Sequence, residues 1–148
     1  MAYSDMRDYL KTLLKAVASV GTVHDYYRFL KGKKRVIAAL FEDGILNTWF
    51  IQKVGEVNVW EGPGMLLTTH IVNILGILSV DDAAASEKTF LGIEADVMTA
   101  LCADYTLGGT CFQLKAPTLK GPQHKAFAGI LTHYGIIEMR LSERVNVS

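Results

Sequence analysis

The chain has 148 residues with 15 basic and 15 acidic side chains, a length that suits one domain with a substantial core. The balanced charge excludes a blanket attraction for nucleic acid or for an anionic membrane surface. Half of the residues are hydrophobic and the mean hydropathy is +0.22, so we expect apolar surface that a partner covers.

The first residues lack the basic head and apolar run of a secretory signal. The most apolar stretch, 65–80, is interrupted by polar residues and falls short of the roughly 18 apolar residues that a membrane span needs. We therefore expect synthesis in the cytoplasm and no membrane partner. Cys102 and Cys111 are not closely spaced, so we expect two free thiols.

The first third of the chain is expected to hold helices and strands around a basic turn. The pattern predicts, in chain order, a helix over 4–20, a strand over 22–24, a basic turn over 31–35, a short amphipathic helix over 36–41 and a strand over 45–53. Gly21 is placed to end the first helix, and Asp43-Gly44 is placed to end the second.

Residues 54–67 predict an irregular loop, because glycines and Pro63 interrupt the pattern. A loop normally lacks large apolar side chains, but this segment keeps several: Val57, Val59, Trp60, Met65, Leu66 and Leu67. Two interpretations stay open. Either the segment folds back on its own core, or Trp60 and its neighbours dock on the next copy of the protein, since aromatic residues and Met are common interface anchors.

The remaining elements have clearer patterns. Residues 68–80 are apolar on both faces, which is typical of a central strand covered on both sides. A helix is expected from there to about Ala103, capped by Asp81, Asp82 or Ser86 and buried along the stripe Phe90, Ile93, Val97 and Leu101. Gly108-Gly109 breaks the chain before a strand over 111–119, and Pro117 places that strand at a sheet edge.

The last expected strand, 127–145, alternates most regularly. One face carries Leu131, His133, Ile137, Met139 and Leu141, and the other carries polar residues that include Tyr134, Glu138 and Arg140. Together the elements predict a single α+β domain over residues 1–148. Its mixed, mainly antiparallel sheet of about four to five strands is packed against two long helices plus one short helix.

The titratable residues lack the spacing of a recognised catalytic or metal site. None of the four histidines (His24, His70, His124 and His133) forms a metal-binding pair, and His133 is expected to be a buried, hydrogen-bonded core residue. A helix cap is favoured over acid–base catalysis for Asp81-Asp82. The chain also lacks a phosphate loop and a nucleophile elbow. We therefore expect a protein that is not an enzyme, with no metal and no cofactor.

One charge run forms a candidate basic patch: Lys31, Lys33, Lys34 and Arg35. A solvated turn is favoured over a phosphate-binding site, because the net charge is zero and no aromatic residues are interleaved. The patch could also pair with acidic residues of a neighbouring copy.

Two stretches carry a resemblance to a known family. THIVNILGILSVDDAAASEKTF (69–90) resembles the strand, turn and helix of siphophage tail terminator proteins, and FAGILTHYGIIEMRLSERV (127–145) resembles the last strand of that family. VHDYYRF (23–29) and GILNTWFI (44–51) resemble its early strands. The resemblance covers most of the chain in order, although no single motif in it encodes chemistry.

The resemblance implies a structural virion protein at the tail neck, assembled in the host cytoplasm. Such a protein forms a ring, with six copies expected, that stops tube growth at the head-proximal end of the tail. Its partners would be copies of itself, the tail tube protein and a neck or head-completion protein, while genomic DNA only passes through the lumen. The candidate interface residues are Trp60, Met65, Leu66, Tyr134, Glu138 and Arg140.

Two alternatives remain. The chain could be another neck component, either a head–tail connector or a stopper ring. It could also be a small ligand-binding or enzymatic α+β domain, which would require a polar-lined pocket.

Overall fold

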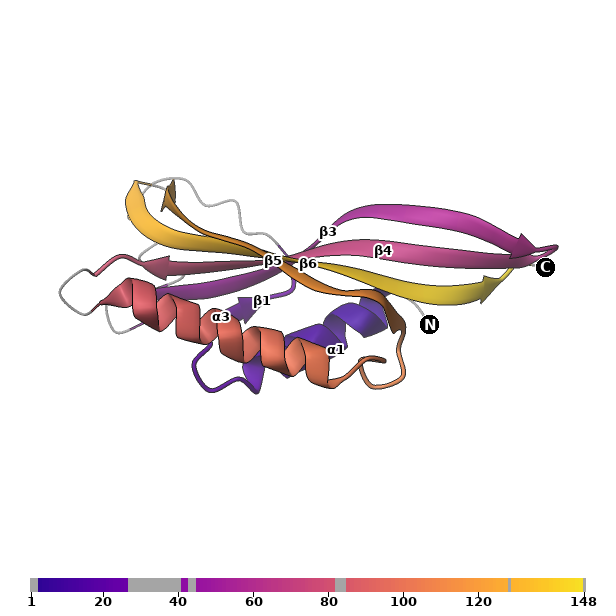
Figure 1. Ribbon diagram of the computed structural model, residues 1–148, viewed down its shortest axis with the longest axis horizontal. Coiled ribbons are helices and arrows are strands. Elements are labelled where there is room, and N and C mark those ends of the chain that lie inside the picture. The colour runs from indigo at the N-terminus through magenta and orange to yellow at the C-terminus, as the bar shows by residue number, and fades with distance from the viewer. Residues whose placement is uncertain (1–2, 27–40, 43–44, 82–84, 128, 148) are drawn as a thin grey trace.

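A long twisted sheet with two helices on one of its faces forms the molecule (Figure 1). The computed structural model describes residues 3–26, 41–42, 45–81, 85–127 and 129–147. Its elements are α1 (Tyr3–Lys15), β1 (Thr22–His24), β2 (Phe41–Glu42), β3 (Ile45–Gly62), β4 (Met65–Ser79), α3 (Ser86–Ala103), β5 (Phe112–Phe127) and β6 (Ile130–Asn146).

The strands run in the order β1-β3-β4-β6-β5, with β2 paired to the start of β3. The β1 strand is parallel to β3, and the other neighbours in the sheet are antiparallel. This confirms the predicted α+β class and the mixed, mainly antiparallel sheet. It also confirms that 68–80 belongs to a central strand, β4, and that the strand with Pro117, β5, lies at an edge.

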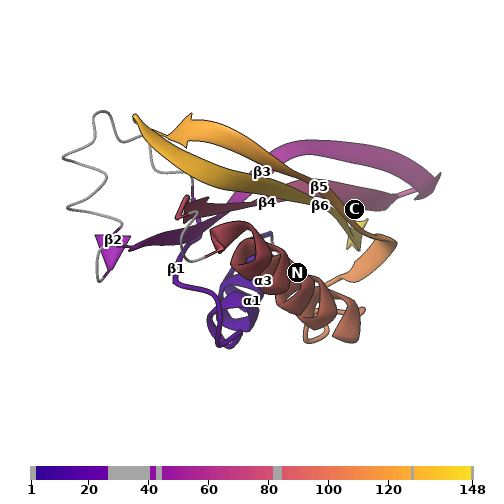
Figure 2. The ribbon, with the colours of Figure 1, turned by 60° about the vertical axis from the view of Figure 1, so that its left-hand side comes forward.

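The main core lies between the sheet and the two helices, which lie together on one side of it (Figures 1 and 2). The α1 helix buries Met6, Leu10 and Leu14 because these residues recur along one stripe. The predicted stripe of α3 is confirmed, since its four members are all buried. Opposite the helices, Trp49 and Ile51 of β3 complete this core.

A second, smaller cluster lies on the other side of the sheet, called the outer face below. It contains Leu46, Phe50, Leu75 and Ile77, with Ile130, Tyr134 and Ile136 packed beside it. Successive strand residues point to opposite faces, so Phe50 belongs to this cluster while Trp49 and Ile51 face the helices. The predicted burial of β4 on both faces is therefore confirmed.

Two glycines directly opposite each other make a depression in the helix-facing side of the sheet. Gly76 of β4 pairs with Gly135 of β6. The Trp49 ring fills the space above Gly76, where a Cβ atom would lie 2.5 Å from the indole. The space above Gly135 is taken by the Glu94 carboxyl group and the Phe90 ring of α3. Both glycines are thus required by close packing rather than by backbone conformation.

Gly76→Ala is expected to lower the free energy of unfolding by about 1–3 kcal/mol, because an added methyl group overpacks the core against Trp49, which is 1% exposed and cannot move aside. Gly92→Ala is the matched control. Gly92 lies in the exposed part of α3 with no atom near its added Cβ, so this change should stabilise by about 0.5–1 kcal/mol. Urea unfolding measures the free energy of unfolding of both variants. Equal changes in the two variants would contradict the conclusion that Gly76 is required by close packing.

The largest correction concerns residues 54–67, because the prediction of a loop was wrong. These residues continue β3 to Gly62 and begin β4 at Met65, with the turn at Pro63-Gly64 between them. The segment extends beyond the two helices, so it has no buried face. Its sequence therefore shows no alternation of apolar and polar residues with a period of two. The interpretation that it folds back on its own core is wrong as well, since Trp60 is 66% exposed.

Other boundaries also differ. The first helix ends at Lys15 rather than near residue 20, and β5 runs to Phe127, where the last strand was expected to begin. The prediction of a side-chain cap on α3 was wrong, because its N-cap is Ala85 and no side-chain hydrogen bond is made there. Leu131 is 55% exposed and so is not part of the buried face of β6. The short helix predicted over 36–41 lies largely outside the described residues, but its last residue, Phe41, belongs to β2.

Candidate functional site

A three-stranded arm extends beyond the helices at one end of the sheet (Figure 1). We define the arm as residues 54–62 of β3, 65–71 of β4 and 140–146 of β6, which pair with one another over its whole length. At the tip, Gly64 has the positive φ of 72° that the tight turn requires. The Val147 N–H donates a 2.7 Å hydrogen bond to the Gly64 carbonyl oxygen, which ties the third strand to this turn.

The arm exposes large apolar side chains on both of its faces. Trp60 is 66% exposed, and four further members are exposed between 38% and 52%: Val54, Val57, Val59 and Met65. Cross-strand pairing places Trp60 beside Leu66 and then Val145 on the helix-facing side of the tip. Val59 and Leu67 form the corresponding pair on the outer face. Apolar surface gathered in this way is typical of a contact with another molecule.

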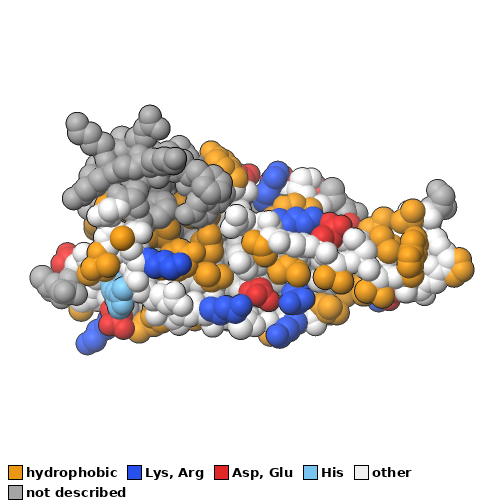
Figure 3. Space-filling view, turned by 90° about the horizontal axis from the view of Figure 1, so that it is seen from above, with side chains coloured by type: hydrophobic (Ala, Val, Ile, Leu, Met, Phe, Trp, Pro, Cys, Tyr) orange, Lys and Arg blue, Asp and Glu red, His pale blue; other side chains and the backbone are white. Residues whose placement is uncertain are grey.

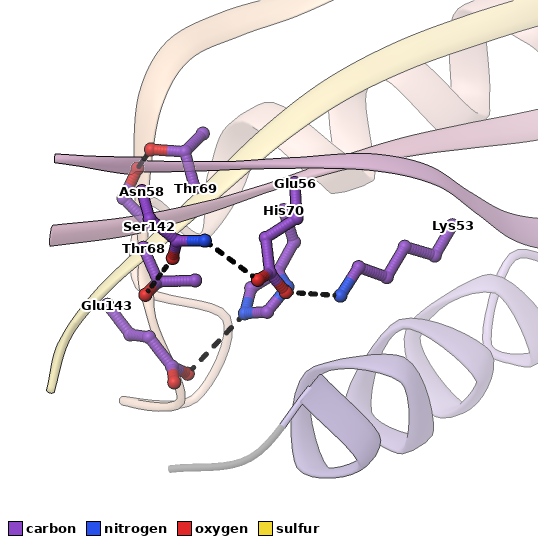
Figure 4. A network of polar contacts seen from close by, with 8 residues as sticks. All are labelled: Lys53, Glu56, Asn58, Thr68, Thr69, His70, Ser142 and Glu143. Atoms are coloured by element: carbon purple, nitrogen blue, oxygen red, sulfur yellow. Dashed lines mark hydrogen bonds and ion pairs between the residues drawn. The ribbon is translucent and has the colours of Figure 1, made fainter.

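A polar network lies at the base of the arm, next to α1 (Figure 4). The His70 imidazole lies between two carboxylates: Nδ1 is 3.4 Å from Glu56 Oε1, and Nε2 is 3.9 Å from Glu143 Oε2. Lys53 Nζ donates a 2.6 Å hydrogen bond to Glu56, which helps to hold the pKa of that carboxyl below its usual value. The Tyr3 ring of α1, 5.4 Å away, lies against His70.

Burial lowers the pKa of His70, and the nearby Lys53 ammonium lowers it further, while the two carboxylates act in the opposite direction. His70 is therefore neutral at pH 7, and its contacts with Glu56 and Glu143 are not ion pairs at that pH. With only 4% of its surface exposed, the imidazole is closed off from a substrate. The network is thus suited to fixing the direction in which the arm leaves the helical layer.

The middle of the outer face is charged (Figure 3). Lys120 Nζ lies 3.2 Å from Glu138 Oε2, and Arg140 lies 3.5 Å from the other Glu138 oxygen. The Lys120 hydrogen bond is the main cause that lowers the pKa of Glu138. Nearby, the Lys125 ammonium lies 4.6 Å from the centre of the Tyr134 ring, a cation–π contact.

The candidate interface residues therefore fall into two groups rather than one patch. Trp60, Met65 and Leu66 lie at the tip of the arm, whereas Tyr134, Glu138 and Arg140 lie along β6 on the outer face of the sheet. The candidate basic patch, Lys31, Lys33, Lys34 and Arg35, lies outside the described residues.

His133 is a buried, hydrogen-bonded core residue, as predicted. Its Nε2 lies 2.7 Å from Ser86 Oγ, and that oxygen also accepts a 2.8 Å hydrogen bond from the Asp81 N–H. The Ser86 hydroxyl proton is therefore free to point at the imidazole. This contact joins the start of α3 to β6 and takes the place of the expected cap.

Glu94 is a buried titratable group that sequence reasoning missed. It lies within the apolar stripe of α3 and is 1% exposed, and neither carboxyl oxygen has a hydrogen-bond partner among the described residues. Burial raises the pKa of Glu94 to about 7. The signal in the sequence is its helical spacing, because Glu94 lies four residues after Phe90 and three before Val97, within the buried stripe.

A shallow, open hollow lies between α1 and the turn before β5. It is lined by Asp5, Asp8, Tyr9, Thr12 and Thr110, and the Tyr9 hydroxyl donates a 2.6 Å hydrogen bond to Asp104 beside it. Its openness suits neither a tightly held metabolite nor a water-free reaction. Within the described parts of the chain, no group of three or more His, Cys, Asp or Glu residues has the arrangement of a metal site.

Neither helix of the described structure is both long and apolar enough to cross a membrane. Comparison with protein-family models found no match for this chain, and comparison with curated proteins found none either.

Proposed function

We propose that the chain is a structural virion protein whose copies form a ring, with six as the expected number. The ring would end the phage tail tube at its head-proximal end and provide the docking surface for neck proteins. The observation that carries the proposal is the projecting arm with Trp60 exposed at its tip, because a free monomer gains nothing from such an apolar surface.

The resemblance to tail terminator proteins supports the same function, since it follows the order of β1, β3, β4, α3 and β6. A closed ring also needs two different surfaces on each copy, because its contacts run head to tail. The arm tip and the charged part of the outer face are two such surfaces, one apolar and one polar. The contact area at the tip would centre on Trp60, a residue type that often dominates binding energy.

Electron microscopy of the purified protein, alone and mixed with the tail tube protein from the same phage, tests the proposal. Rings, or tubes of arrested length with a ring at one end, are the expected result. A monomer that leaves tube growth unchanged at high concentration would refute it. A ring that binds head or neck proteins but ignores the tube would instead favour the connector or stopper alternative.

Trp60→Ala should leave the melting temperature within a few degrees of the parent, because a 66% exposed side chain contributes little to the fold. It should nevertheless reduce ring formation at least tenfold in apparent affinity, the effect expected for a central aromatic anchor. Calorimetry measures the melting temperature, and sedimentation velocity measures ring formation. Leu131→Ala is the control. Leu131 is 55% exposed, but it lies at the end of β6 that is away from the arm, so this variant should assemble normally.

A further inference from the structure

The two edges of the sheet are protected to very different degrees. The β5 edge carries Pro117 and Pro122, three breaks in its register with β6, and the exposed lysines Lys115, Lys120 and Lys125. Prolines, irregularities and lysines are the usual means by which a protein prevents another strand from pairing with an edge. The β5 edge is therefore a poor acceptor for a further strand.

Along the arm, the β3 edge has two register breaks with β4, between Lys53 and Gly55 and between Trp60 and Gly62, but no proline and no irregularity lies between them. Among the described strands, β1 and β2 pair with β3 only at residues 45–46 and 48–50, so 51–62 has one open edge. Its charged side chains are engaged within the same copy, in the pairs Lys53–Glu56 and Glu61–Arg144. Between them lies the run Val57-Asn58-Val59-Trp60, which carries no charge and three exposed apolar side chains.

We propose that this edge pairs with the same edge of a second copy, antiparallel and about a two-fold axis at Val57. In that register Val57 lies opposite Val57 of the other copy, and Val59 lies opposite Gly55. Glu56 lies opposite Asn58, a carboxylate beside an amide, and the register breaks of β3 at Val54 and Glu61 bound the paired segment. Apolar side chains thus meet across the contact, and the Glu56 carboxylate faces an amide rather than another carboxylate.

The faces of the strand agree with this register. Gly55, Val57 and Val59 pair with β4 residues of the outer face, whereas Glu56 and Asn58 pair with His70 and Thr68 on the helix-facing side. A two-fold axis perpendicular to the sheet at Val57 keeps each residue opposite one on its own face. The five regular positions from Gly55 to Val59 are about the usual length of a strand pairing.

Neighbouring registers fit worse. An axis at Asn58 would set the Glu56 carboxylate against Trp60, and an axis at Glu56 would set the two Glu56 carboxylates against each other. The first shift leaves a charge facing an apolar side chain, and the second leaves two like charges facing each other. The complementarity of the edge with itself is the reason to choose a second copy as the occupant, rather than an unrelated strand.

Cysteine cross-linking tests the register directly. In a background with the exposed Cys102 changed to Ser, Val57→Cys places two thiols directly opposite each other. Opposite Cα atoms in an antiparallel pair are about 4.5–5.5 Å apart, within the range of a disulfide. Mild oxidation should therefore convert most of the Val57→Cys protein to a covalent dimer on a non-reducing gel.

Val59→Cys is the matched control. Val59 is similarly exposed, at 52% against 46%, and lies on the same face of the same strand. Its two copies would be offset by four residues, roughly 13 Å along the strands, so they cannot form a disulfide. A dimer from Val59→Cys but not from Val57→Cys would overturn this register, and no selective dimer from either would overturn the pairing.

Val57→Asp supplies a second test, without oxidation. It puts two carboxylates directly opposite each other and should break the two-fold contact. This variant should therefore sediment at half the mass of the parent assembly, whether that assembly is a pair of rings or a pair of single copies, with an unchanged melting temperature. A parent that stays monomeric at about 100 μM would overturn the inference. The two-fold pairing differs from the head-to-tail contact of a ring. A ring without cross-linking at position 57 would therefore reject this pairing but leave the proposed function intact.

Discussion

Ile137→Asp is expected to abolish the cooperative fold at neutral pH. Ile137 is 1% exposed, lies in the main core, and is flanked across the sheet by Ile74 and Leu119. The substitution removes a buried aliphatic side chain and adds a carboxylate to a core whose described members include no Lys or Arg. The combined cost of several kcal/mol is comparable to the whole stability of a small domain, about 5–15 kcal/mol. Loss of the urea unfolding transition and of dispersed amide resonances would be the observed result.

Two controls separate the buried charge from a general effect of mutating β6. Ile137→Val keeps the site apolar and should cost only about 0.5–1.5 kcal/mol. Leu131→Asp introduces the same charge on the same strand, but at a side chain that is 55% exposed, so it should change stability by less than about 0.5 kcal/mol. If Ile137→Asp unfolds with a transition close to the parent's, the packing of β6 against the helices is wrong.

The elements that could be predicted from the sequence are those with one face on a core. The α3 stripe from Phe90 to Leu101 shows a helical period because the sheet buries one side of that helix. The two apolar faces of β4 indicated a central strand because clusters lie on both sides of it. In each case the hydrophobic pattern indicates which side chains become buried when the chain folds. Burial of this kind is the property that can be read most directly from a sequence.

The arm could not be recognised by the same reasoning, because neither of its faces is covered within one copy. Its strands therefore mix exposed apolar and charged residues, and the glycines suggested a loop. One local signal did exist: Gly62-Pro63-Gly64 between Val57-Asn58-Val59 and Leu66 is compatible with a tight hairpin turn. The predicted loop was therefore wrong, while the interface role of Trp60, Met65 and Leu66 stays a prediction.

Buried polar groups were the other part that pattern reasoning could not find. His70 and Glu94 are 4% and 1% exposed, yet neither residue type predicts burial by itself. The environment of His70 depends on Tyr3 and Glu143, which lie far from it in the sequence. Glu94 lies over Gly135 because that glycine has no Cβ atom to fill the space. The helical spacing of Glu94 places it on the buried stripe of α3, but the glycine that makes room for its carboxyl group leaves no periodic signal.

Glu94 gives the protein a pH dependence whose sign can be worked out. Its pKa is raised by burial from 4.5 to about 7 in the folded chain, whereas the unfolded chain keeps the ordinary value. Below pH 4.5 Glu94 is protonated in both the folded and the unfolded chain, so its burial does not cost the free energy of burying a charge. As the pH rises from 4.5 through 7, the unfolded state ionises first, so stability falls. Above this range the loss attributable to Glu94 is about 3 kcal/mol.

Glu94→Gln isolates this contribution, because an amide has nearly the same shape and does not ionise. Urea unfolding of the parent and the variant from pH 4 to 8.5 should show the stability difference shifting in favour of the variant by about 3 kcal/mol across the range. The difference between the two proteins is the informative quantity, since carboxyls with lowered pKa values, such as Glu138, act in the opposite direction in both.

Glu87→Gln, in the exposed first turn of α3, is the control, and its stability difference from the parent should stay within about 0.5 kcal/mol at every pH. A difference for Glu94→Gln that is equally flat would mean that the Glu94 carboxylate is solvated or paired in the folded protein. An intermediate slope would mean that the charged Glu94 carboxylate is partly hydrated in the folded protein. Because Trp49 lies over Gly76 beside the paired Gly135, its fluorescence should report such hydration between pH 6 and 8 in the parent and not in the Gln variant.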